Sequence, residues 1–410
     1  MLSALAIGES RIEGLLEGED VLATAAAMRA MGAQIERGAD SVWRVHGVGV
    51  GGLLQPQAAL DMGNSGTSTR LLMGLVSSHA ITATFTGDAS LSRRPMGRVI
   101  DPLSKMGADF TASPGGRLPL MVRGLCPAVP IRYRLPVASA QVKSAIMLAA
   151  LNTPGITHVI EPVATRDHSE RMLSGFGARI EFGKDNGERV IAVHGEAELR
   201  PQQIMVPGDP SSAAFLMVAA LLVPGSEVTI TNVGVNPTRA GLIEVLKAMG
   251  GDVDMVQPRT IGGEPVVDLV VRHSTLTGIE TDHAIVPSMV DEFPILFIAA
   301  ALAQGRSVLR GLDELRVKES DRIRVMADGL RAIGVQVEEV DDGLIIDGTG
   351  GDPLPGGGAI ESHLDHRIAM SFAVAGLVSK AGVTIDDMEP VATSFPGFVD
   401  LLKSLGDSNG

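Results

Sequence analysis

The sequence predicts an α/β (α+β) protein of two domains, each made of three repeated βαβαββ units with buried parallel helices. The first observation is length, because 410 residues are more than a single domain usually contains. The second is a recurring apolar helix that leads through small residues into a strand, as in RLLMGLVSSHAITATFTG and AAFLMVAALLVPGSEVTITN. The third is a more polar helix that ends in glycine before another strand, as in GRVIDPLSKMGADFT.

The two types of helix predict where each one lies. The first type is apolar on nearly all sides and should be buried, whereas the second has a charged face and should cover the outside of the sheets. Six copies of the unit divide evenly into two domains, residues 1–205 and 206–410. This boundary, just before VPGDPSS, depends on counting repeats, because the composition does not shift there.

Composition and charge restrict the class of partner. The net charge of −14 disfavours broad binding to nucleic acid or to an anionic membrane, although basic side chains gathered locally can bind small anionic substrates. The single cysteine, Cys126, excludes an intrachain disulfide and is typical of a reducing compartment. The longest apolar runs, such as Ala213 to Val223, are shorter than the roughly 18 residues that a membrane span needs. We expect a cytoplasmic monomer with small-molecule partners and no contact with nucleic acid or membrane.

A cluster of Gly, Ser, Thr or Asp precedes each predicted buried helix. In residues 60–78, LDMGNSGTSTRLLMGLVSS, a strand that ends at Met62 leads through such a cluster into a helix that begins near Thr67. Free backbone N–H groups and the positive end of the helix dipole favour an anion there. A capped turn would explain any one copy, but the cluster recurs in PVASAQVKS, VPGDPSS, VPSMVDEF and SHLDHR. If the buried helices run parallel, we expect their starts to form two opposed faces with an anion-binding cleft between them.

Basic side chains are concentrated in residues 91–98, 164–171, 314–324 and 364–370. Arginine binds carboxylate and phosphate through paired hydrogen bonds, so these stretches are candidates for substrate binding. For ELRVKESDRIR an ordinary solvent-exposed helix face explains the pattern equally well. Asp291, at the start of the most apolar helix, is either a partner of the helix dipole or a catalytic base. His168, His363 and His366 lack metal-ligand spacing, so we expect no metal site.

A series of motifs occurs in a fixed order along the whole chain: GNSGT, SRRPMGR, ASAQVKSA, VPGDPSSAA, DEFPIL, ELRVKESDR, LDHRIAMS and ATSFP. In this order they resemble the 5-enolpyruvylshikimate-3-phosphate synthase (3-phosphoshikimate 1-carboxyvinyltransferase) family. The resemblance implies the inside-out barrel fold of enolpyruvyl transferases, a cytoplasmic location and no metal or organic cofactor. The implied reaction moves the enolpyruvyl group of phosphoenolpyruvate to the 5-hydroxyl of shikimate 3-phosphate, in the shikimate pathway to chorismate and the aromatic amino acids. It also implies a target of the herbicide glyphosate.

The resemblance further implies which residues act on the substrates. Asp291 matches the family's base for the 5-hydroxyl, and Glu319 beside Lys318 is the candidate acid for the methylene carbon. The implied contacts of shikimate 3-phosphate are Ser139, Ala140, Gln141, Arg166, Asp291 and Lys318. The implied contacts of phosphoenolpyruvate are Asn64, Gly66, Arg94, Gln141, Arg322 and Arg367. Ala140 stands where some relatives have a second serine, and Thr393 stands where other subclasses have a lysine.

Two alternative functions follow from the sequence. The related transferase that acts on UDP-N-acetylglucosamine carries a cysteine in a loop near the Arg94 region, but LSRRPMGR has none and Cys126 lies too far along the chain. The second alternative is a truncated, non-catalytic remnant of the enzyme.

Both ends of the sequence predict a shortened chain. MLSALAIGESRIEG matches the end of a buried helix and its strand, so the first domain is expected to lack the start of its first helix. The resemblance places a Gly-Asp-Lys-Ser motif, followed by Ser and Arg, in that upstream segment. KSLGDSNG ends where other units continue into a strand, so the second domain is expected to lack terminal strands. A misplaced start codon would explain the missing helix start, and we expect low activity from the chain as written.

Overall fold

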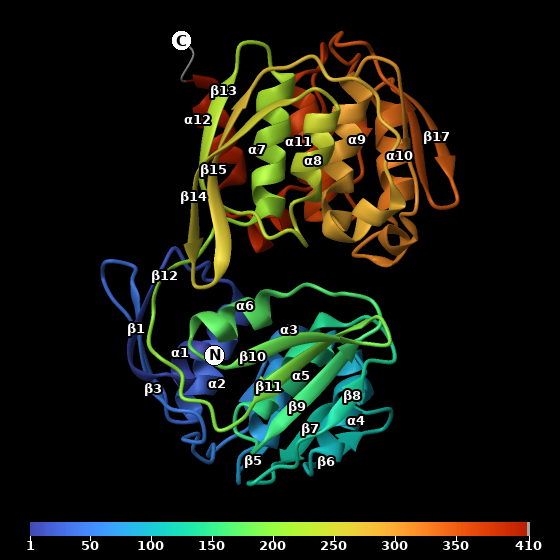
Figure 1. Ribbon diagram of the computed structural model, residues 1–410. Coiled ribbons are helices and arrows are strands. Elements are labelled where there is room, and N and C mark those ends of the chain that lie inside the picture. Colours follow the sequence, from blue (N-terminus) through green and yellow to red (C-terminus); the bar gives the residue numbers. More distant parts are fainter. Residues whose placement is uncertain (408–410) are drawn as a thin grey trace. The chain divides into compact units, whose positions relative to one another are not determined.

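The computed structural model describes residues 1–407 and divides into two compact units. The first unit contains Met1–Val206 together with Ile261–Glu264, and the second contains Pro207–Thr260 and the chain from Pro265 onward. Each unit has its own apolar core. Figure 1 shows helices packed together with sheets in both units.

The first unit has three four-stranded sheets with the orders β12-β1-β3-β2, β4-β5-β7-β6 and β10-β11-β9-β8. Their strands are β1 (Ile7–Glu13), β2 (Gln34–Arg37), β3 (Trp43–Val48), β4 (Leu60–Asp61), β5 (Thr82–Thr86), β6 (Asp109–Ser113), β7 (Arg117–Arg123), β8 (Arg132–Arg134), β9 (Ile156–Glu161), β10 (Ile180–Asp185), β11 (Glu188–His194) and β12 (Gln203–Met205). Each sheet has one parallel pair, β1–β12, β4–β5 or β8–β9, and is otherwise antiparallel. The three sheets therefore share one topology, as repeated units require.

The second unit has sheets with the orders β13-β15-β14, β16-β18-β17 and β19-β20. Their strands are β13 (Glu227–Gly234), β14 (Asp252–Ile261), β15 (Glu264–Arg272), β16 (Arg306–Leu309), β17 (Gln336–Val340), β18 (Gly343–Asp347), β19 (Ala359–Ile360) and β20 (Thr384–Ile385). In the first two of these sheets the parallel partner found in the first unit is reduced to single bridges, such as Gly208 with Val233 and Glu280 with Val308, whereas β19 pairs with β20 in parallel in the third. The repeat therefore persists with shorter edge pairing.

Apolar helices form the centre of each core. They are α1 (Leu2–Leu5), α3 (Gly66–Ser77) and α5 (Ala140–Ala150) in the first unit, and α7 (Pro210–Leu222), α9 (Phe293–Leu302) and α11 (His366–Leu377) in the second. Every residue of α9 is buried, which agrees with its lack of a polar face. The remaining α-helices are α2 (Glu19–Ala30), α4 (Gly97–Lys105), α6 (His168–Gly175), α8 (Gly241–Ala248), α10 (Arg322–Ala332) and α12 (Phe398–Asp407). Short 3-10 helices are η1 (Leu91–Arg93), η2 (His283–Ser288), η3 (Val290–Glu292), η4 (Asp313–Val317) and η5 (Glu389–Thr393).

Two glycines allow helices to approach closely near the predicted site residues. A Cβ atom on Gly74 of α3 would lie 2.2 Å from the carbonyl oxygen of Ala145 in α5, so only glycine permits this packing. A Cβ atom on Gly329 of α10 would lie 2.3 Å from the ring of Phe372 in α11. These contacts bring α3 against α5 and α10 against α11, and they set the spacing of the side chains at the starts of those helices.

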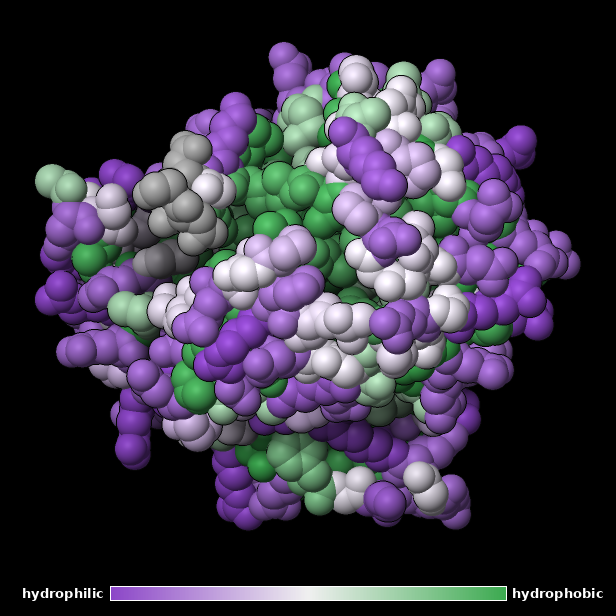
Figure 2. Space-filling model, turned by 90° about the horizontal axis from the view of Figure 1, so that it is seen from above, coloured by the Kyte–Doolittle hydropathy of each residue, from purple (hydrophilic) through white to green (hydrophobic). Residues whose placement is uncertain are grey.

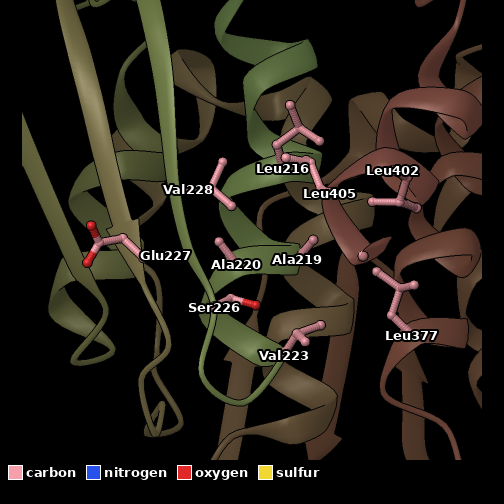
Figure 3. Close-up of a pocket in the computed structure, with 11 residues that line it drawn as sticks. Leu216, Ala219, Ala220, Val223, Ser226, Glu227, Val228, Leu377, Leu402 and Leu405 are labelled. Carbon is pink, nitrogen blue, oxygen red and sulfur yellow. The ribbon is translucent and has the colours of Figure 1, made fainter. Parts of the chain in front are cut away.

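An apolar cavity of about 260 Å³ lies in the second unit, beside α7, β13 and α12 (Figure 3). Leu216, Ala219, Val223 and Leu405 are among its lining residues. In Figure 2, apolar residues form the floor of a hollow on the face of this unit that is seen from above. The cavity reaches the C-terminal end of α7, the negative end of the helix dipole, so it does not suit phosphate groups.

Candidate active site

The starts of α3 and α5 bring together residues from two of the motifs. Ser65 and Ser139 occupy the N-cap positions, where their hydroxyl oxygens accept backbone N–H groups of the first turn. Arg70 Nη1 donates to Gln141 Oε1 at 2.8 Å, and Gln141 Nε2 donates to Thr67 Oγ1 at 2.9 Å. Arg70 therefore orients Gln141, a predicted contact of both substrates. Arg70 itself was not predicted, although it ends the GNSGTSTR stretch.

Arg94 lies beside the start of α3. Its Nη2 atom donates to Asn64 Oδ1 at 2.7 Å, and its Nη1 atom donates to the Asn64 carbonyl oxygen at 3.3 Å. Asn64 Nδ2 in turn donates to Asp88 Oδ2 at 2.6 Å. Hydrogen bonds from the Leu91 backbone and the Asn64 side chain lower the pKa of Asp88. The ionised Asp88 thus holds Asn64, and Asn64 holds Arg94.

Two guanidinium groups converge at Gly66. A Cβ atom added there would lie 2.9 Å from Arg70 Nη1 and 3.2 Å from Arg94 Nη1. Burial, and after it the charges of neighbouring arginines, lowers the pKa of Arg70. Cations gathered in this way at a helix start attract an anion. The predicted phosphoenolpyruvate contacts that belong to the first unit therefore lie together.

Two more predicted contacts, Ala140 and Arg166, lie near the start of α5. Ala140 is the first residue of that helix. Arg166 lies in the loop between β9 and α6, and its carbonyl oxygen accepts a hydrogen bond from Lys143 Nζ at 2.9 Å. The sequence analysis did not single out the buried Lys143, because the predicted contacts in ASAQVKSA are the residues at the start of the helix.

In the second unit, Asp291 of η3 is surrounded by cations. Its Oδ1 atom lies 3.5 Å from Lys318 Nζ and 3.5 Å from Arg322 Nη1. Arg367 Nη1 donates to the main-chain carbonyl oxygen of Asp291 at 3.1 Å. Residues from three separate motifs therefore meet at one aspartate. A carboxylate in this setting can accept a proton from a hydroxyl while the cations hold anionic groups of the substrate.

Arg322 links several carboxylates of this cluster. Its Nε atom lies 2.8 Å from Asp365 Oδ2, and its Nη2 atom lies 2.6 Å from Glu319 Oε2. The Arg322 side chain is only 1% exposed, so a solvent-exposed helix face does not describe this part of ELRVKESDRIR. Burial raises the pKa of Asp365, but hydrogen bonding and the charge of Arg322 outweigh it, and the pKa lies below its ordinary value. Asp365, the N-cap of α11, was not predicted as part of the site.

Glu292 forms a second buried cluster that was not predicted. Its carboxylate accepts a hydrogen bond from Ser211 Oγ, and its Oε1 atom lies 3.7 Å from Arg239 Nη2 and 3.9 Å from Arg367 Nη1. Arg239 Nη2 also donates to Ser211 Oγ at 2.5 Å. Burial raises the pKa of Glu292 in spite of these partners. The cluster connects the starts of α7, α9 and α11, because each helix contributes a residue at or next to its first turn.

The remaining predicted positions have simpler surroundings. Thr393 lies in η5, and its Oγ1 atom donates to the Pro390 carbonyl oxygen at 2.6 Å. Burial lowers the pKa of His366 from its ordinary value of 6.5, which favours the neutral imidazole at pH 7.

Among residues 1–407, no group of His, Cys, Asp and Glu side chains is arranged to hold a metal ion. The same residues include no helix with the length and apolar character of a membrane crossing.

Comparisons with known proteins identify the family of this chain. The family described as EPSP synthase (3-phosphoshikimate 1-carboxyvinyltransferase) matches residues 1–402. The 3-phosphoshikimate 1-carboxyvinyltransferase of Sphingopyxis alaskensis is 73% identical over 99% of this chain and 92% of its own length. The enzyme of the same name from Novosphingobium aromaticivorans is 71% identical over 98% of this chain and 92% of its own length.

Solved structures give the same result. An EPSP synthase structure from Acinetobacter baumannii superposes with a TM-score of 0.94 at 49% identity, covering 99% of this chain and 92% of that one. The enolpyruvyl transferase NikO from Streptomyces tendae has a TM-score of 0.74 at 21% identity, covers 99% of this chain and 91% of that one, and shares the fold. The predicted fold class is therefore confirmed. The match over residues 1–402 and the 73% identity to a relative over nearly the whole chain show that the chain belongs to the EPSP synthase (3-phosphoshikimate 1-carboxyvinyltransferase) family.

Proposed function

We propose that this protein transfers the enolpyruvyl group of phosphoenolpyruvate to the 5-hydroxyl of shikimate 3-phosphate and releases phosphate, in the shikimate pathway to chorismate. The observation that carries the proposal is the position of Asp291, whose carboxylate lies 3.5 Å from both Lys318 Nζ and Arg322 Nη1. Relatives of the same enzymatic name over nearly the whole chain support it. An alternative acceptor, UDP-N-acetylglucosamine, has no comparable support.

The first chemical step is an addition. Asp291 accepts the proton of the 5-hydroxyl while that oxygen bonds to C2 of phosphoenolpyruvate, and C3 gains a proton to become a methyl group. Glu319 is the proposed donor to C3. Its carboxylate is half exposed and lies against Arg322, the guanidinium that also contacts Asp291. One arginine thus sets the spacing between the proposed base and the proposed acid.

The second step is an elimination. The C2–O bond to phosphate breaks, C3 loses a proton, and inorganic phosphate leaves with the bonding electrons. The leaving phosphate carries negative charge, which Arg322 and Arg367 stabilise more strongly as it develops. The proposed reaction therefore needs cations around the reacting carbon, and the second unit supplies them next to Asp291.

Substrate binding is assigned to two sets of residues. The proposed contacts of shikimate 3-phosphate are Ser139, Ala140, Gln141, Arg166, Asp291 and Lys318. The proposed contacts of phosphoenolpyruvate are Asn64, Gly66, Arg94, Gln141, Arg322 and Arg367. The convergence of Arg70 and Arg94 at Gly66 supports an anion at the start of α3.

The direct test is an assay of phosphate release by the purified 410-residue chain. With both substrates present, we expect one phosphate for each enolpyruvyl ether detected by proton NMR. Omitting either substrate should abolish release, and UDP-N-acetylglucosamine should not replace shikimate 3-phosphate. Phosphate release that does not depend on shikimate 3-phosphate would indicate hydrolysis and would contradict the proposal.

We also propose a cytoplasmic location and a monomeric state. The single Cys126, which is exposed and makes no disulfide, supports a reducing compartment. Cell fractionation tests the location, and light scattering at several protein concentrations tests the monomer. Recovery of the protein with membranes, or a mass that doubles with concentration, would contradict these two statements.

A further inference from the structure

A fully buried lysine lies behind the proposed shikimate 3-phosphate contacts. Lys143 of α5 has no exposed side-chain surface, and its Nζ atom has three oxygens within 3.0 Å. They are Glu161 Oε1 at 3.0 Å, Glu170 Oε1 at 2.8 Å and the carbonyl oxygen of Arg166 at 2.9 Å. The ammonium group is thus surrounded by two carboxylates and one carbonyl oxygen, and the carbonyl oxygen accepts a hydrogen bond from it. The role of such a costly buried charge requires an explanation.

The carboxylates of this cluster are nearly inaccessible to solvent as well. Glu161 is the last residue of β9, and Glu170 lies in the first turn of α6. Arg189 of β11 adds a second cation, with Nη1 at 3.0 Å from Glu161 Oε2 and 3.5 Å from Glu170 Oε1. Two cations and two anions make the cluster neutral overall. Tight packing of α5, β9 and α6 is therefore compatible with burying these charges.

Stability alone does not explain this buried cluster of charges, because buried ion pairs are often no more stabilising than apolar residues of the same size. The distinguishing feature is that hydrogen bonds connect the cluster to the loop between β9 and α6. Lys143 Nζ donates to the carbonyl oxygen of Arg166, while Glu161 Oε1 accepts from Thr165 Oγ1 at 2.6 Å and from Thr165 N at 3.3 Å. Lys143 and Glu161 therefore hold Arg166 and Thr165, two neighbouring residues of the loop between β9 and α6.

Glu170 takes a different part in the cluster. It lies close to the Lys143 charge, but among residues 1–407 neither of its carboxylate oxygens has a hydrogen-bond partner of good geometry. Lys143 Nζ and Glu170 Oε1, 2.8 Å apart, therefore form an ion pair without a well-directed hydrogen bond. Burial raises the pKa of Glu170. Glu170 thus balances charge, whereas Lys143 and Glu161 bind the loop directly.

We propose that Lys143 and Glu161 are positioning residues that hold the backbone of Thr165 and Arg166, and so fix the direction in which Arg166 meets shikimate 3-phosphate. This inference rests on the proposed function, because it assigns Arg166 to that substrate. Lys143 lies on the same helix as Ser139 and Gln141, so one helix both contacts the substrate at its start and fixes a further contact from its buried side.

The test compares substrate affinities in charge-balanced variants. Lys143→Met/Glu170→Gln removes one cation and one anion, keeps the cluster neutral and deletes the hydrogen bond to Arg166. Thr165→Val removes the hydroxyl donor to Glu161 without removing a buried charge. Ser144→Ala is the matched control, because Ser144 Oγ hydrogen-bonds to Ser169 Oγ at 2.6 Å between the same two helices, away from the loop.

Binding of shikimate 3-phosphate is measured by calorimetry, and KM for each substrate is measured by phosphate release. For the double variant we expect affinity for shikimate 3-phosphate to fall by about 10-fold to 100-fold, with less than about 3-fold change in KM for phosphoenolpyruvate, since small misplacements of a binding group have effects of this size. Thr165→Val should show a smaller loss of the same kind, and Ser144→Ala should resemble the parent.

The outcomes separate the positioning role from the function on which it rests. Equal losses for both substrates, or affinities of both loop variants within 2-fold of the Ser144→Ala control, would overturn the positioning role while leaving the proposed function in place. If the double variant does not fold, Thr165→Val decides by the same criterion. A parent chain that binds no shikimate 3-phosphate would overturn both statements.

Discussion

Arg322 Nε lies 2.8 Å from Asp365 Oδ2, and both side chains are almost completely buried, with 1% and 0% exposed. Arg322 is the first residue of α10, and Asp365 caps the start of α11. The pair therefore joins two helix starts in the second unit. Asp365 accepts hydrogen bonds from both Nε and Nη2 of Arg322, while Nη2 also lies 2.6 Å from Glu319 Oε2 and Nη1 lies 3.5 Å from Asp291 Oδ1. Three predictions concern this pair and the neighbouring Asp291 and Glu292, and a fourth concerns Gly66 in the first unit.

Asp365→Asn should destabilise the protein by about 3 to 5 kcal/mol, because it leaves the buried Arg322 charge without its fully buried counterion. The asparagine keeps the shape of the cap, so the loss reports on charge. KM for phosphoenolpyruvate should rise as well, since Arg322 is a proposed contact of that substrate. Urea unfolding followed by circular dichroism measures the first effect, and phosphate release measures the second.

Asp328→Asn is the control for that experiment. Asp328 lies on α10 and forms only exposed pairs, with Arg331 at 3.0 Å and Arg324 at 4.0 Å. Exposed pairs contribute about 0 to 1 kcal/mol, so this change should hardly alter unfolding. Equal destabilisation by the two substitutions would show that the Arg322–Asp365 pair has no special role.

Asp291→Asn should lower turnover by about 100-fold or more, because it keeps hydrogen bonding but removes the proposed base. Affinity for shikimate 3-phosphate should change little. Glu314→Gln is the matched control, since Glu314 Oε1 also pairs with Lys318 Nζ, at 2.5 Å, but its side chain is 64% exposed. Single-turnover and steady-state rates measure the effect, and an Asn variant within a few-fold of the parent would rule out a role as base.

Gly66→Ala should weaken inhibition by glyphosate more than it weakens use of phosphoenolpyruvate. The new methyl group would lie 2.9 Å from Arg70 Nη1 and 3.2 Å from Arg94 Nη1, so a guanidinium group must shift and the space beside the bound anion becomes smaller. One carbon in a tight site changes discrimination by about 10-fold or more, and the longer anion should suffer most. The inhibition constant and KM are compared with those of Gly97→Ala, where a Cβ has open space. Equal changes in both constants would contradict the steric argument.

Glu292→Gln should change stability in a pH-dependent way. Burial raises the pKa of Glu292 above its ordinary value of 4.5, so the folded protein binds this proton more tightly than the unfolded chain. The group therefore favours folding below pH 4.5, and this contribution is lost as the pH rises through the folded-state pKa. Arg239 Nη2 and Arg367 Nη1 face this carboxylate at 3.7 Å and 3.9 Å, and both arginines are kept in the variant.

The free energy of unfolding of the parent minus that of Glu292→Gln should accordingly fall from pH 4.5 to neutral pH. The control is Glu338→Gln, because Glu338 is 62% exposed and pairs with an exposed Arg306 at 3.7 Å. Its difference from the parent should stay nearly constant over the same range. If the difference in free energy of unfolding between the parent and Glu292→Gln does not change with pH, burial does not raise the pKa of Glu292.

Several features of the fold could be predicted from the sequence because they depend on neighbours along the chain. Apolar residues around the whole of Phe293–Leu302 predict a buried helix, and the Gly, Ser and Asp clusters predict where the buried helices begin. Helix α3 begins at Gly66, next to the predicted start near Thr67. Asp291, Arg322 and Arg367 could be singled out because each lies in a motif that carries the family resemblance. Their roles on the substrates stay predictions until the variants are measured.

Pairing between distant segments could not be predicted from the same patterns. Arg322 and Asp365 are 43 residues apart, and Ser211 and Glu292 are 81 residues apart, yet each pair meets inside the second unit. The sequence determined the local properties, namely helix starts, apolar faces and glycine stops, because they follow from the nearest residues in the chain. Only the tertiary structure decided which carboxylate lies against which cation, because burial brings distant charges into contact and leaves them no water to bind instead.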